Sequence, residues 1–163
     1  MQINSFCENN YSENFFFSAL EIENFTKKML EFALKEAPSV DFSLDYDYQL
    51  EILICNNEFI HNINRDYRQK DAPTDVITFA LYWDSEDKVI VENTISLGQI
   101  VISADKVFEQ AKNNDVTEKY ELLNLLSHGI LHLIGFTHDN EDDLIEMLNL
   151  QEKMIASVDY VKI

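Results

Sequence analysis

The sequence predicts an α+β (mixed α/β) single domain over residues 1–163, in which a small mixed sheet packs with helices. The length suits one domain with one core. With only two prolines and three glycines, the chain favours long regular elements joined by compact connections. The predicted elements mix helix and strand early and are all helical late, which is typical of this class.

The first half of the chain gives three periodic segments. Apolar side chains recur at helical spacing between residues 22 and 33, and Pro38 ends that segment. Residues 48–54 alternate between apolar and polar side chains, which is the period of a strand with one wetter face. Residues 56–71 (NNEFIHNINRDYRQKD) indicate a short helix that runs into a loop. The first twenty residues show no pattern that carries chemistry.

The second half begins with two predicted strands and continues with helices. Residues 75–83 (DVITFALYW) and 95–103 (ISLGQIVIS) are β-branched and aromatic runs, each typical of a strand. Three helical stretches follow, at about 103–113, 117–134 and 140–157. Three of the four histidines of the chain lie around the junction of the last two helices.

The composition argues against several classes of protein. The chain contains no run of eighteen apolar residues, so we expect no membrane span. Its start lacks the positive segment of a signal peptide, and its two distant cysteines are expected to be reduced thiols, which predicts a cytoplasmic protein. The net charge of −18 argues against broad, non-specific binding of nucleic acid but leaves room for a local positive patch.

The histidine cluster, SHGILHLIGFTHDN, predicts a metal site. His128 and His132 are four residues apart, so on a helix they share one face. Gly135 stands where a helix commonly ends in a left-handed cap, and a sharp turn there can fold His138 back. Three converging imidazoles leave a fourth tetrahedral position open, as in catalytic zinc sites. We therefore predict one Zn²⁺ per chain on a zincin-like metal helix, although nickel, copper and iron accept such ligands too. The alternative is three core histidines without a metal.

The same spacing matches the zinc-peptidase pattern H-E-x-x-H-x-x-G-x-x-H, with one departure. Gly129 follows His128, where the peptidase requires a glutamate as general base. Without this proton acceptor the peptidase mechanism is incomplete. Hydrolysis of a peptide or amide is therefore a minor alternative.

Both arginines of the chain lie within four residues of each other. Arg65 and Arg68 are followed by Lys70 in the segment NRDYRQKDAPTDVITF. Arg65 fits a solvated loop, whereas we expect Asp71 and Asp75 to fix the orientation of Arg68. A guanidinium that faces a zinc ion would hold a phosphate with two hydrogen bonds and stabilise the charge of the transition state.

Two motifs resemble those of a known family. The first comprises Asn64, Tyr67-Arg68, Lys70-Asp71, Pro73-Thr74-Asp75-Val76 and Thr78-Phe79. The second comprises His128-Gly129, Leu131-His132-Leu133, Gly135-Phe136 and His138. Together they strongly resemble the YbeY endoribonucleases, zinc-dependent bacterial enzymes of ribosomal RNA maturation, and residues 97–103 and 146–155 are similar as well. Thr137 and Gln99 depart from the family, which usually has aspartate at both places. Asp139 is a possible substitute for the first aspartate as a partner of a ligand histidine.

The resemblance implies a zinc-dependent endoribonuclease that is specific for single strands and acts in 16S ribosomal RNA 3′-end maturation and ribosome quality control. Its partners would be single-stranded RNA and the small ribosomal subunit. We expect His128, His132 and His138 to hold the metal, and Arg68 to act catalytically on the phosphodiester. Arg65 and Lys70 are expected to bind substrate, and the general base stays unassigned. The alternative from another class is a non-catalytic ribosome-assembly factor with a structural zinc.

The acidic composition fits an RNA-binding protein less well, since such proteins are usually basic. We expect RNA to enter through a narrow channel formed by Arg65, Arg68 and Lys70, delivered by a ribosomal partner. Cleavage of free RNA should then be weak and sensitive to salt.

Overall fold

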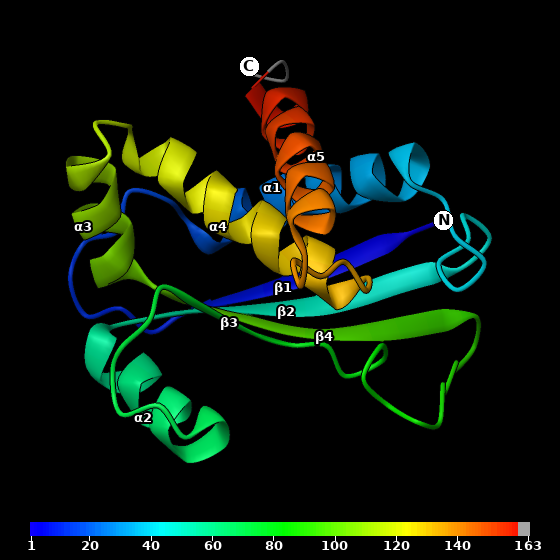
Figure 1. The fold of residues 1–163 in the computed structure, drawn as a ribbon, viewed down its shortest axis with the longest axis horizontal. Helices are drawn as coiled ribbons and strands as arrows, with labels where there is room; N and C mark the ends of the chain where they lie inside the picture. Colours follow the sequence, from blue (N-terminus) through cyan, green and yellow to red (C-terminus); the bar gives the residue numbers. More distant parts are fainter. Residues whose placement is uncertain (160–163) are drawn as a thin grey trace.

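A four-stranded sheet organises the chain in a computed structural model that describes residues 1–159 (Figure 1). Its strand order is β1-β2-β4-β3, with β1, β2 and β4 parallel and β3 antiparallel to β4. The strands are β1 (Ile3–Asn9), β2 (Asp47–Cys55), β3 (Val76–Phe79) and β4 (Thr94–Ser103). The helices are α1 (Ala19–Glu36), α2 (Asn57–Arg68), α3 (Ala104–Asn113), α4 (Glu118–Leu133) and α5 (Glu141–Asp159). The predicted α+β class with a small mixed sheet is thus confirmed.

Two strands differ from the sequence prediction. Strand β1 was not predicted, because only one of its seven side chains is buried and its partner, β2, is distant in the sequence. Strand β3 is shorter than the expected 75–83. It ends at Phe79, where the Leu81 N–H donates to the Phe79 carbonyl (3.0 Å) and begins a turn.

The helices cover the two faces of the sheet unequally. Helices α1, α3, α4 and α5 lie on one face, and α2 lies on the other (Figure 1). Most of the core is on the first face, where nearly all the apolar side chains of α4 are buried. On the second face, Ile60 and Ile63 of α2 contact a small apolar cluster that includes Leu53, Ile77 and Val101. No other helix of residues 1–159 lies over that face (Figure 1).

Helix α4 approaches the sheet closely, and Gly129 is the reason. A Cβ atom at this position would lie 2.9 Å from the Ile100 side chain of β4, closer than real contacts allow. The side of α4 that carries Gly129 therefore faces the sheet.

Two further expectations, reduced cysteines and no membrane span, can be compared with residues 1–159. Cys7 and Cys55 are free thiols that form no disulfide there. None of the helices in residues 1–159 is both long enough and apolar enough to cross a bilayer.

Candidate metal centre

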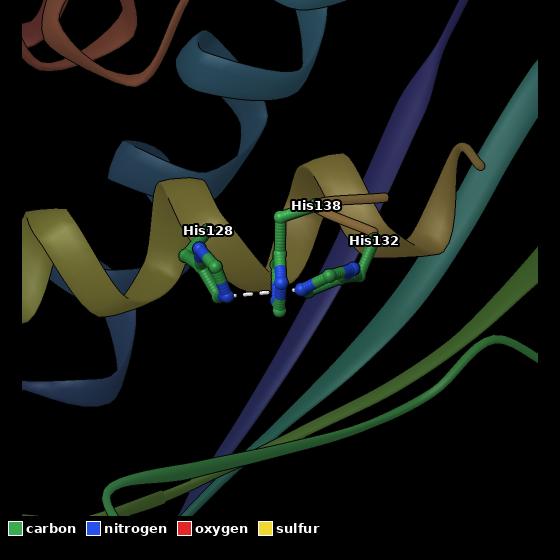
Figure 2. A group of neighbouring side chains, drawn as sticks. All are labelled: His128, His132 and His138. Atoms are coloured by element: carbon green, nitrogen blue, oxygen red, sulfur yellow. Dashed lines mark hydrogen bonds between the residues drawn. The ribbon is translucent and has the colours of Figure 1, made fainter. Parts of the chain in front are cut away.

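Three histidines from α4 and the turn after it converge on one point. His128 and His132 lie one helical turn apart on the same face of α4, and their Nε2 atoms are 2.9 Å apart. His138 reaches the same point from the following loop, as Figure 2 shows. One ligand nitrogen of each ring lies within 4.8 Å of those of the other two. The structure thus brings together the three histidines that the sequence singled out.

The turn that returns His138 has the hydrogen-bond pattern of a Schellman motif. Helix α4 ends at Leu133, and Gly135 adopts a left-handed φ of 95°. The Gly135 N–H donates to the His132 carbonyl (3.1 Å), and the Phe136 N–H donates to the Leu131 carbonyl (2.9 Å). The expected helix end at Gly135 is confirmed. Trp83 packs against this glycine so closely that a Cβ would lie 2.8 Å from the indole ring.

Hydrogen bonds at Nδ1 orient two of the imidazoles. His132 Nδ1 donates to the Phe136 carbonyl (3.0 Å), and His128 Nδ1 donates to Oε1 of Gln151 (3.0 Å). Gln151 lies on α5, is 3% exposed and donates from Nε2 to Oδ1 of Asn124 (3.2 Å). With hydrogen on each Nδ1, the two Nε2 atoms carry lone pairs that face each other. A cation between the rings would remove this repulsion.

The protonation state of His132 suits a metal ligand. Burial, and next the neighbouring His128, lowers the pKa of His132 to about 4. The ring is therefore neutral at pH 7, which is the form that binds metal. Three converging imidazoles, two of them oriented through Nδ1, fit zinc well, and they fit other divalent transition metals as well.

Arg68 lies in the same pocket as the histidines. This cavity of about 400 Å³ is lined by Arg68, Thr74, Asp75, Val76, Thr78, His128, His132 and His138. Arg68 is the last residue of α2, which ends because Gln69 adopts the left-handed conformation (φ 56°). The Arg68 side chain has no hydrogen-bond or ion-pair partner among residues 1–159. Its charge is therefore available to a ligand of the pocket.

The expectation that Asp71 and Asp75 hold Arg68 is wrong. Asp71 accepts from His61 Nε2 (2.7 Å) instead. Asp75 Oδ1 accepts from the Val76 N–H (2.7 Å), and its Oδ2 accepts from Gln110 Nε2 (3.4 Å). Both carboxylates are therefore occupied elsewhere.

The other two expected cations lie apart from the histidines. Arg65 is exposed and donates to Asp66 (3.1 Å), and neither Arg65 nor Lys70 lines the pocket. The expected channel of three cations is thus reduced at the metal centre to Arg68. That Arg65 and Lys70 bind substrate stays a prediction.

Sequence reasoning also missed polar partners around the pocket. Gln110 links Asp75 to Glu121, donating to Glu121 Oε1 (2.7 Å), and Glu121 is 3% exposed. Desolvation, opposed by the Gln110 hydrogen bond, raises the pKa of Glu121. Asp139, the possible partner of a ligand histidine, forms no hydrogen bond with any of the three histidines among the described residues. Gln151 instead orients a ligand histidine, because it accepts the hydrogen bond from Nδ1 of His128. The sequence does contain a signal for Gln151: it is a polar residue at helical spacing from Met147 and Met154, which are buried.

Comparison with known proteins gives one consistent result. The family model described as Endoribonuclease YbeY matches residues 7–159. Endoribonuclease YbeY of Fusobacterium nucleatum is 36% identical over 159 residues, covering 98% of this chain and 89% of that protein. Endoribonuclease YbeY of Bacillus subtilis is 38% identical over 138 residues, covering 83% and 82%. The solution structure of TM1509 from Thermotoga maritima is similar with a TM-score of 0.59 and 26% identity, covering 96% of this chain and 89% of that one.

Proposed function

The chain belongs to the YbeY endoribonuclease family, and on that premise we propose that it is a zinc-dependent endoribonuclease specific for single strands. Its reaction class, hydrolysis of internal phosphodiester bonds of RNA, follows from the family. We further propose that its substrate is 16S ribosomal RNA, at 3′-end maturation and in ribosome quality control. Single-stranded RNA and the small ribosomal subunit would then be its partners.

One observation carries this proposal: an unpaired guanidinium shares a pocket with three converging imidazoles. Arg68 comes from α2 and the histidines come from α4 and its following turn, so the fold joins two distant segments. A site for a phosphodiester needs a cation that can grip two phosphate oxygens, and arginine has that geometry. A structural metal alone would not require a free arginine beside it.

Zinc, when bound by His128, His132 and His138, supplies a Lewis acid that activates water near neutral pH. Around it, Gln151 and the Phe136 carbonyl keep two of the rings in the tautomer that presents Nε2. Arg68 would bind the phosphate and offset the negative charge that grows on its oxygens in the transition state. Asp75 is the only carboxylate that lines the pocket in the described structure.

The geometry disfavours a peptidase. A side chain at position 129 would run into Ile100, so the glutamate base of zinc peptidases has no room there without a shift of the sheet contact. The assembly-factor alternative shares the metal and differs in what it requires of Arg68.

Two measurements test the proposal. The first is metal content by mass spectrometry for the wild type and His132→Ala, with folding checked by circular dichroism. We expect about one zinc per wild-type chain and none in the folded variant. The second is cleavage of single-stranded RNA by Arg68→Ala, with Arg65→Ala as the matched comparator from the same helix.

The outcomes separate the alternatives. We expect Arg68→Ala to lower kcat by about a hundredfold or more with zinc content unchanged, and Arg65→Ala to have a much smaller effect. An Arg68→Ala chain that still supports ribosomal RNA maturation in cells would favour the assembly factor. A wild type that takes up no metal when zinc is supplied would refute the metal centre itself.

A further inference from the structure

The face of the sheet opposite the metal centre carries an open groove that the proposed reaction does not use. It has a volume of about 820 Å³ and runs along α2, over the part of the sheet that no other helix of residues 1–159 covers (Figure 1). Several large apolar side chains are left exposed there, including Phe6 (56%) and Tyr67 (69%). Apolar surface exposed in one patch commonly marks a binding site.

The floor of the groove is one row of side chains across all four strands. Strand register places Phe6 beside Glu51, Glu51 beside Gln99, and Gln99 beside Phe79. All four line the groove. With neighbouring strands about 4.8 Å apart, the two rings stand roughly 14 Å from each other. Between the two rings lie the Glu51 carboxylate and the Gln99 amide, which can form hydrogen bonds with polar groups of a ligand.

The wall of the groove comes from α2. Phe59, Ile63 and Tyr67 lie four residues apart on one face of this helix and line the groove. The Tyr67 ring meets Phe79 edge to face, with centroids 5.9 Å apart. The groove therefore offers aromatic surfaces from three separate elements: β1, α2 and β3.

The groove adjoins the metal pocket across a single strand. Thr78 lines the metal pocket, whereas the next residue, Phe79, lines the groove, because side chains alternate along a strand. Strand β3 is at the edge of the sheet. Likewise, Tyr67 of α2 lines the groove and Arg68 lines the metal pocket. A flexible polymer that passes around this edge strand would reach both sites.

Charge decides which kind of polymer fits. Arg68 and Lys70 lie at the end of α2, and neither side chain has a partner in the described part of the chain. An apolar polypeptide would cover the aromatic rings but leave these cations unused. A polyanion with aromatic bases uses both. Glu51 on the floor repels phosphates, so bases would lie over the sheet and phosphates toward the end of α2.

We propose that this groove binds the nucleobases of the single-stranded RNA that flank the scissile phosphate, by stacking on Phe6, Tyr67 and Phe79. The inference rests on the proposed function, since it assigns the flanking part of the same substrate. Stacking on aromatic side chains tolerates any sequence, because every base has a π-face, and it adds to the attraction between cations and phosphates. It also explains how a chain with a net charge of −18 can hold RNA.

Phe6→Ala gives the sharpest test, because β1 lies at the opposite edge of the sheet from β3 and the metal pocket. The probe is a single-stranded RNA of about ten nucleotides that carries 2-aminopurine, a length within the usual range of stacking sites. We expect quenching of 2-aminopurine on binding to the wild type. Phe6→Ala and Tyr67→Ala should lose much of that quenching and raise KM for the RNA about tenfold.

Controls separate this inference from the proposed function. Phe16→Ala removes a ring outside the groove that is about as exposed (68%) as Tyr67 (69%). This variant should leave quenching and KM unchanged. Bis(4-nitrophenyl) phosphate has no flanking bases, so the rise in KM for RNA in Phe6→Ala should far exceed any change for this diester. Quenching reports binding even if no RNA is cut, in which case the proposed function alone fails. Wild-type quenching and KM in both groove variants would overturn the inference and leave the groove to a polypeptide.

Discussion

Gln151 is predicted to control how tightly the chain binds zinc, although it is not a ligand. It is 3% exposed, accepts from His128 Nδ1 at 3.0 Å and donates to Asn124 at 3.2 Å. Gln151→Met keeps the length of the side chain and removes both hydrogen bonds. His128 is then free to rotate or to change tautomer, so its Nε2 is no longer held toward the other two histidines.

The size of the effect follows from the bonds lost. Removing a partner that orients a ligand histidine typically weakens metal binding by about 10–100-fold, or roughly 1.4–2.7 kcal/mol. The metal-free chain loses stability too, because a donor and an acceptor are left without partners at about 1–3 kcal/mol for each that water does not reach. We therefore expect weaker zinc binding and a lower free energy of unfolding in the same variant.

Competition with a chromophoric zinc chelator measures the affinity, and urea unfolding measures the stability. Gln151→Glu retains an acceptor for His128 and should bind zinc at least as tightly as the wild type, although the buried charge lowers the stability of the metal-free fold. Asn149→Ala, at an exposed position of the same helix, is the control for general effects on α5. Wild-type zinc affinity in Gln151→Met would show that His128 is oriented without this bond.

Three further predictions concern the turn, the buried acid and the metal. Gly135→Ala combines a left-handed φ of 95° with a collision against Trp83, so we expect a loss of roughly 2 kcal/mol or more in unfolding free energy and weaker zinc binding through His138. The pKa of Glu121 is raised in the fold above its ordinary 4.5, so the folded state binds more protons than the unfolded state above that pH. Wild-type stability relative to Glu121→Gln should therefore fall as pH rises from about 4.5, and an equal difference at pH 5 and pH 7.5 would contradict this. Removing zinc with a chelator should stop RNA cleavage and lower Tm, and zinc should restore both.

The elements with strong periodicity could be predicted from sequence, and the ones fixed by distant contacts could not. Helix α4 and its end at Gly135 follow from local patterns, because helix face and cap chemistry are short-range. Strand β1 has no such pattern. It forms because its backbone pairs with β2, from Ile3↔Tyr48 to Asn9↔Ile54. The apolar residues after Phe79 resemble a strand in sequence but do not continue it. One of them, Trp83, instead packs against Gly135 in the turn that follows α4.

The candidate site divides in the same way. The three histidines could be found because their spacing along one helix and its turn is local. Arg68 could be singled out by the local cluster of cations and by its motif, but its expected acidic partners were wrong, since adjacency in sequence does not fix which side chains meet. Gln151 and Gln110 come from other helices, and their contacts depend on tertiary packing. Residues that would contact the metal or the substrate are thus easier to predict from sequence than the residues that orient them.

The number of cations that contact RNA decides how its binding depends on salt. The sequence suggested a channel of Arg65, Arg68 and Lys70, whereas the metal pocket is lined by Arg68 alone of the three. For single strands the slope of log K against log salt is about −0.7 for each phosphate that is neutralised. Arg68 alone therefore predicts a slope of about −0.7, Arg68 with Lys70 about −1.4, and all three cations about −2. Titrations of the 2-aminopurine RNA between about 0.05 and 0.3 M salt measure this slope. A slope between about −0.7 and −1.4 means that stacking supplies most of the affinity, whereas a slope near −2 that Arg65→Ala also reduces would restore the three-cation channel and weaken the case for the groove.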